Sequence, residues 1–252
     1  MKRKSLYLVL VPLLLWFLNE LFFVEPAFFF ASLGIAILIL SLSIKAIIKD
    51  TSPKFWLVFV LSPALFYLSF SFYSAIIVSQ FWIQAIFILN ALFIYYYLKN
   101  IYYYFSFGAP ERELKLKKLL LSGSFLATFA LSATLYGLPI FLNWPSLSLL
   151  LVFCLLSFFI FSQFLVFSKQ IDNNQKIYLG INVLILTQFA GALFLLPLNY
   201  NILGLLVAIV FYLLVLFNSW QTEDRLNFKN LRWPLGIAAS IITLILLTAR
   251  WL

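Results

Sequence analysis

The sequence predicts an all-α fold, a polytopic bundle of about nine transmembrane helices with the N-terminus inside the cell and the C-terminus outside. The first reason is composition, because 65% of the 252 residues are hydrophobic, only 10% are charged, and the mean hydropathy is +1.07. A soluble domain carries about 25% charged residues. The second reason is that the apolar residues form runs of about 20, the helix length that crosses roughly 30 Å of hydrocarbon. The third is that Lys and Arg gather in alternate connections.

Short polar or proline-containing breaks separate the apolar runs and give each helix its limits. The spans are expected at 6–24, 27–48, 55–78, 81–98, 119–142, 147–167, 177–198, 202–220 and 233–250. The connections after the first, third, fifth and seventh spans are "VEPA", "SQ", "LNWPS" and "NYN". Pro, Asn and Ser in these segments favour turns. The weakest of them is Ser79-Gln80. Pro12 and Pro63 lie well inside their spans and predict kinks.

The segment before the fifth span is also expected to be helical. In "APERELKLKKLLL", Pro110 suits a first helical turn, and Glu111 and Glu113 lie near the positive end of the helix dipole. Each Glu has a Lys four residues later, Lys115 or Lys117, which is the favourable order for an ion pair. We expect this helix to lie at the inner membrane surface and to run on into the fifth span.

The positive charges predict which side each connection faces. The N-terminus "MKRK" is basic, and so are the connections after the second, fourth, sixth and eighth spans, whereas the other connections contain no Lys or Arg. All of the 17 Lys and Arg residues except Arg250 then fall on one side, which is the cytoplasmic side by the positive-inside rule. Fusing the third and fourth spans would place Lys54 and Lys99 on opposite sides. The charge pattern therefore supports the break at Ser79-Gln80.

The same charges indicate the partners of the chain. The net charge of +9 lies mainly in short loops next to the membrane, where it meets anionic lipid headgroups, and this argues against binding to nucleic acid. We expect a single integral membrane domain, residues 1–252, in a cytoplasmic or plasma membrane. Its expected partners are the lipid bilayer, anionic headgroups at the basic inner loops, and other membrane proteins.

The residue inventory predicts no catalytic centre, no metal site and no cofactor. The chain has no His, so the commonest general base and metal ligand is missing. Its one Cys, Cys154, lies within the sixth span, which excludes an intrachain disulfide and a thiolate zinc site. Neither a G-x-x-x-x-G-K-[ST] phosphate loop nor a paired D-x-x-D motif is present. The inventory therefore leans against an enzyme.

A few polar residues within or next to the spans are candidates for a functional or structural role: Asn19, Glu20, Glu25, Asn90, Asn182, Gln188 and Arg250. The deep amides can bond across helices or line a polar cavity. Glu20 lies about 22 Å along the first span, short of the outer boundary. Three interpretations stay open for it: a protonated or hydrated residue with no special role, a partner of Arg250, or part of a site for a substrate or coupling ion.

Three function classes also stay open. A membrane-embedded scaffold or complex subunit fits the short loops and interhelical amides, and is the interpretation that we favour. A transporter or flippase for an apolar or amphiphilic substrate fits the span number and a suggested repeat, because Leu-Pro-x-x-x-Asn occurs at both 138–143 and 196–201. Helix termination explains both of these prolines as well. The third class is an enzyme acting on a lipid-linked substrate. Glu25 is similar in place to an acidic residue of some membrane glycosyltransferases, although those enzymes have a substantial loop there.

Overall fold

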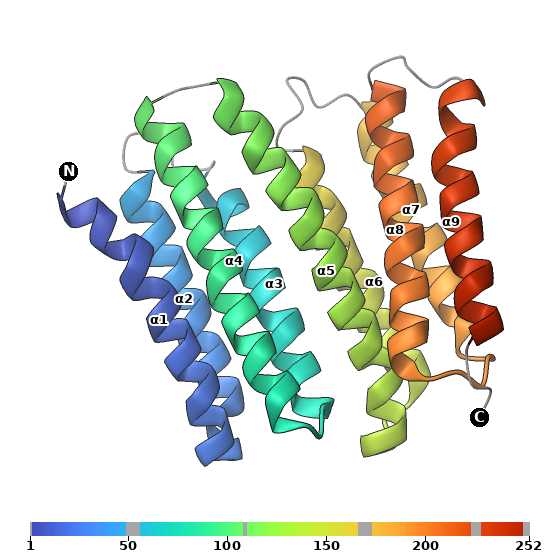
Figure 1. Cartoon of the computed structure of the whole chain (residues 1–252), viewed down its shortest axis with the longest axis horizontal. Helices are drawn as coiled ribbons and strands as arrows, with labels where there is room; N and C mark the ends of the chain where they lie inside the picture. The colour runs from blue at the N-terminus through green and yellow to red at the C-terminus, as the bar shows by residue number, and fades with distance from the viewer. Residues whose placement is uncertain (1, 49–55, 108–109, 166–172, 223–227, 249–252) are drawn as a thin grey trace. The chain divides into compact units, whose positions relative to one another are not determined.

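The computed structural model describes residues 2–48, 56–107, 110–165, 173–222 and 228–248, and these residues are almost entirely helical (Figure 1). The elements in chain order are α1 (Lys2–Val24), η1 (Pro26–Phe28), α2 (Phe29–Ile47), α3 (Trp56–Ile76), α4 (Gln80–Phe107), α5 (Pro110–Leu142), α6 (Ser146–Leu165), α7 (Asn173–Leu193), α8 (Tyr200–Thr222) and α9 (Phe228–Thr248). The predicted all-α fold is confirmed. Within the described ranges, eight helices are long and apolar enough to cross a membrane, and the apolar part of α1, Leu6–Phe22, is shorter. By helix length and hydropathy, the chain is a multi-pass membrane protein.

The helices group into two compact units. The first unit is Met1–Ala127 and the second is Thr128–Leu252, so α5 contributes to both. In the first unit, α1 packs against α2 and α4, and α3 packs against the same two helices. In the second unit, α6 packs on α7, α7 on α8, and α8 on α9. The expectation of one integral membrane domain stays a prediction.

The break at Ser79-Gln80 is present in the structure. α3 ends at Ile76 and α4 begins at Gln80. The Ile77 N–H donates to the Ser74 carbonyl at 3.3 Å, a three-residue spacing that tightens the end of α3. α3 and α4 also pack against each other, so they form a hairpin of two helices. The prediction from the charge pattern is therefore confirmed at this position.

The helix predicted ahead of the fifth span is confirmed as well. α5 begins at Pro110 and continues to Leu142 as one helix. Lys117 Nζ lies 2.7 Å from Glu113 Oε1, which is one of the two predicted ion pairs. The side chain of Glu111 lies outside the described residues, so the other pair stays a prediction. The expected position of this helix at the inner membrane surface also stays a prediction.

The two copies of Leu-Pro-x-x-x-Asn are not structurally equivalent. Pro139 lies inside α5, and Asn143 ends this helix with a φ of 53°, a left-handed conformation that Asn tolerates. Pro197 instead lies after the end of α7, and Asn201 lies in the first turn of α8. Helix termination is therefore wrong for Pro139, because the end of α5 comes from the cap at Asn143. Pro139 still removes one hydrogen bond from the helix, because its nitrogen has no N–H to donate to the carbonyl of residue 135.

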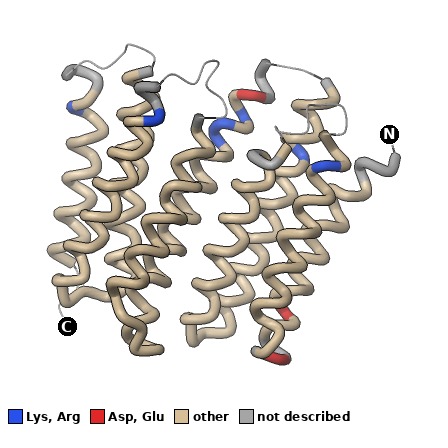
Figure 2. Tube along the Cα trace, turned by 180° about the vertical axis from the view of Figure 1, so that it is seen from behind, with Lys and Arg blue, Asp and Glu red and all other residues tan. Residues whose placement is uncertain are grey.

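Charged residues of the first unit lie toward the ends of its helices. Figure 2 shows Lys and Arg gathered at one end of these helices together with an acidic position, while other acidic positions lie at the opposite end. Lys45 is in the last turn of α2, and Lys99 is on the half of α4 that leads to the same end. Glu20 and Glu25 lie where α1 leads into α2, at the opposite end. The apolar middle of the first unit is thus bounded by Lys and Arg at one end, and by Glu20 and Glu25 at the other.

Candidate functional site

Asn19 and Glu20 are neighbours near the end of α1 but have different surroundings. Asn19 is 4% exposed, and its Oδ1 accepts a hydrogen bond from Ser71 Oγ of α3 at 3.1 Å. Glu20 is half-buried, and Glu25 is exposed directly after the helix. Asn19 therefore links two helices, whereas Glu20 is not enclosed by the first unit.

A helix defect lies in α3, where Pro63 has no N–H to donate. In a regular helix, the N–H of residue 63 would bond the carbonyl of Phe59. The hydroxyl of Tyr97, which is fully buried on α4, donates to this carbonyl at 2.9 Å. Tyr97 thus replaces the donor that Pro63 lacks and joins α4 to α3.

A second buried tyrosine donates a hydrogen bond near the end of another helix. Tyr136 of α5 is 2% exposed, and its hydroxyl donates to the carbonyl of Ala190 on α7 at 2.8 Å. α7 ends at Leu193, and the Phe194 N–H donates to the Gly191 carbonyl instead of to Ala190. Helix ends leave carbonyl groups without partners inside the helix. Tyr136 supplies a donor for one of them.

Asn90 is the most unusual polar residue of the first unit. It is 1% exposed, and neither its Nδ2 nor its Oδ1 has a hydrogen-bond partner in the described part of the chain. It lies about 15 Å from the start of α4, near the middle of a roughly 30 Å hydrocarbon layer. The interhelical bond expected for this amide is therefore not what the structure shows. A neutral amide can bind a water molecule or a polar ligand atom, but it is a poor proton acceptor.

The remaining predicted residues are not brought together in one site. Asn182 is 6% exposed and its Nδ2 has no partner among the described residues, whereas Gln188, six positions later on α7, is exposed. Both belong to the second unit. Gln163, which the sequence places near a span end, is 2% exposed. Arg250 lies outside the described residues, so its pairing with Glu20 stays a prediction.

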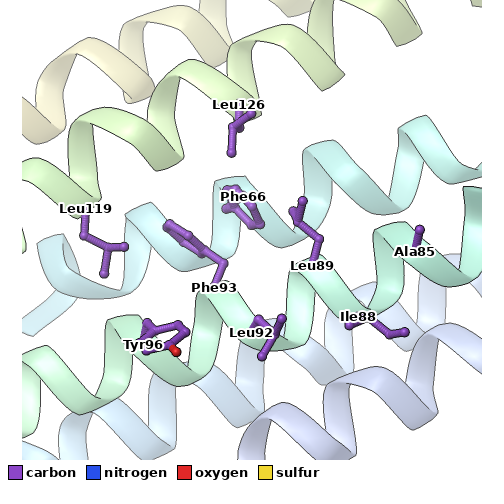
Figure 3. Close-up of a pocket in the computed structure, with 9 residues that line it drawn as sticks. All are labelled: Phe66, Ala85, Ile88, Leu89, Leu92, Phe93, Tyr96, Leu119 and Leu126. Carbon is purple, nitrogen blue, oxygen red and sulfur yellow. The ribbon is translucent and has the colours of Figure 1, made fainter.

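An apolar groove lies on the first unit between α4 and α5 (Figure 3). It has a volume of about 420 Å³, and its floor is made by Phe66 of α3 and Phe93 of α4, whose stacked rings have centroids 3.8 Å apart. α4 contributes further side chains from Ala85 to Tyr96, and α5 contributes Leu119 and Leu126. The Tyr96 hydroxyl is the one polar side-chain group among these lining residues. Sequence reasoning missed the groove, because apolar lining residues look like any other part of a span.

The described residues contain no group of three or more His, Cys, Asp or Glu side chains that could hold a metal ion. No protein-family model matches the chain, and neither a curated protein nor a solved structure matches it. The class of the protein therefore rests on its helices. It is a multi-pass membrane protein with buried amides, tyrosine bonds between helices, and an apolar groove in its first unit.

Proposed function

We propose that the chain is a membrane-embedded scaffold or complex subunit that binds a transmembrane helix of another membrane protein through α9. The observation that carries this proposal is how little of α9 the rest of the chain covers. In its apolar window, Leu231–Thr248, 6% of the residues are buried, whereas the windows of the other candidate spans are 33% to 78% buried. A helix that packs only along one edge leaves most of its surface for lipid or for a partner.

The uncovered face of α9 carries a pair of small residues. Ala238 is the one buried residue among positions 231–248 and marks the face toward α8. Gly236 and Ser240 lie two positions before and after it, which places them about 160° around the helix from Ala238. A Cβ at Gly236 would meet nothing within 4 Å, and the Ser240 hydroxyl donates to the Gly236 carbonyl at 2.8 Å. Small residues four apart let a second helix backbone approach closely, and this favours a helix over lipid chains as the occupant.

Purification in a mild detergent tests the proposal. We expect a second membrane protein to co-purify in a stoichiometric amount, as identified by mass spectrometry. Gly236→Leu should remove it. Gly34→Leu on α2 is the matched control, because a Cβ there also meets nothing within 4 Å. A lone wild-type chain, a complex of identical copies only, or equal retention by both variants would contradict the proposal.

We also infer nine spans, with the N-terminus inside and the C-terminus outside. α1 is the span that we add to the eight longer helices. It packs along α2 and α4, which are both long enough to cross the membrane. The separation of Lys residues from Glu20 and Glu25 in the first unit supports the orientation, since cytoplasmic connections collect positive charge.

A further inference from the structure

The groove between α4 and α5 has the length and lining of a hydrocarbon site. Along α4 it runs from Ala85 to Tyr96, about 16 Å of helix, which is about half the roughly 30 Å hydrocarbon thickness of a bilayer. Leu92 and Tyr96 on its rim are each 51% exposed, while Phe66 and Phe93 on its floor are buried (Figure 3). An open apolar groove of this length matches one lipid chain from one leaflet.

Two lysines lie just beyond one end of this groove. Lys99 is three residues after Tyr96 on α4, and Lys115 is four residues before Leu119 on α5. Residues three or four apart share a helix face, so each lysine extends a row of lining side chains. Lys115 is exposed and Lys99 is partly exposed, with its Nζ 5.6 Å from the centroid of the Tyr95 ring.

No ion pair joins Lys99 or Lys115 to a described carboxylate, and Glu111, the partner that the sequence predicts for Lys115, has its side chain outside the described residues. Glu113, the nearest described carboxylate in sequence to Lys115, is paired with Lys117 at 2.7 Å. Glu20 and Glu25 lie at the opposite end of the first unit. The end of the groove next to Lys99 and Lys115 is therefore its cationic end.

We infer that this groove binds one acyl chain of an anionic phospholipid, whose headgroup is held by Lys99 and Lys115. The chain fills the space over Phe66 and Phe93, and the phosphate lies at the level of the two ammonium groups. Each lysine near a membrane surface contributes attraction that corresponds to about fivefold in affinity, so together they give a preference of roughly 30-fold for an anionic over a zwitterionic headgroup.

Native mass spectrometry of the delipidated full-length protein tests this site. The protein is titrated with palmitoyl-oleoyl phosphatidylglycerol and, separately, with phosphatidylcholine that has the same chains. We expect the wild type to bind phosphatidylglycerol roughly 30-fold more tightly, and the double variant Lys99→Gln/Lys115→Gln to lose this preference. The matched control is Lys45→Gln/Lys176→Gln, which removes the same charge at positions on neither α4 nor α5 and should keep the preference.

The apolar part of the site has its own test. Ala85→Phe fills the far end of the groove, so both lipids should bind at least tenfold more weakly to it. As a measurement on the wild type, phosphatidylglycerol with a photoreactive acyl chain should label peptides of α4 and α5. Equal binding of the two lipids to the wild type, an unchanged preference in the Lys99/Lys115 variant, or labelling confined to other helices would overturn the inference.

Discussion

Removing the hydroxyl of Tyr97 tests how the first unit compensates for the proline in α3. In the wild type, this hydroxyl donates to the Phe59 carbonyl at 2.9 Å, and Pro63 offers no N–H for the same carbonyl. Tyr97→Phe keeps the ring and removes only the donor. The Phe59 carbonyl then loses the bond that Tyr97 donates in place of the missing Pro63 N–H.

Two general values bracket the expected loss of stability. Hydrogen bonds between transmembrane helices contribute about 0.6 kcal/mol on average and at most about 1.7 kcal/mol. Leaving a buried polar group without a partner costs about 1–3 kcal/mol. Tyr97→Phe removes one such bond from a buried carbonyl, so we expect it to lower the free energy of unfolding by about 1–2 kcal/mol.

Restoring the missing N–H gives the decisive comparison. In a Pro63→Ala background, residue 63 can donate to Phe59, so Tyr97→Phe should cost only about 0.5 kcal/mol or less. Unfolding by SDS in mixed micelles, followed by tryptophan fluorescence, measures all four variants. Equal losses in the two backgrounds would refute the reasoning.

Three other predictions follow from single positions. Gly204→Ala should lower the unfolding free energy by about 1 kcal/mol or more, because the new Cβ lies 2.8 Å from a backbone nitrogen of α5. At Gly180 a new Cβ meets nothing within 4 Å, so Gly180→Ala should raise the unfolding free energy by up to about 1 kcal/mol. Asn90→Leu should raise stability by about 1 kcal/mol, since it removes a buried amide with no partner among the described residues, and a loss instead would indicate a bound water or ligand. In a cysteine-free background, a membrane-impermeant maleimide added to intact cells should label Ser79→Cys but not Ser106→Cys, and the reverse pattern would invert the proposed orientation.

The helices were predictable because membrane insertion imposes strong constraints on sequence. A span needs about 20 apolar residues and each connection needs a suitable charge, and both requirements are visible without a structure. Charge placement alone resolved the turn between α3 and α4, where turn-forming residues are few. Helix-start chemistry at Pro110 likewise predicted that α5 begins well before its apolar part.

Contacts between helices were not predictable in the same way. Whether Asn19 meets Ser71, or Tyr97 meets Phe59, depends on the rotation and axial position of two helices, and periodicity within one helix does not determine either. Pro63 did carry a usable signal, because a missing N–H implies a donor from elsewhere. The groove gave no signal, since its lining residues are as apolar as those that face lipid. Asn90 shows the opposite case: its depth was predicted, but its lack of a partner was not.

The bond from Tyr97 to Phe59 also has a consequence for how the chain is made. α3 leaves the ribosome before α4 does, so it would enter the bilayer with a proline and without the bond that Tyr97 donates to the Phe59 carbonyl. The short turn between the two helices lets α4 follow at once and supply the hydroxyl. We therefore expect α3 and α4 to leave the insertion machinery together as a helical hairpin. A long soluble insert at Ser79 should then reduce the yield of inserted protein more than the same insert at Asn143. At Asn143, no such bond joins the flanking helices among the described residues.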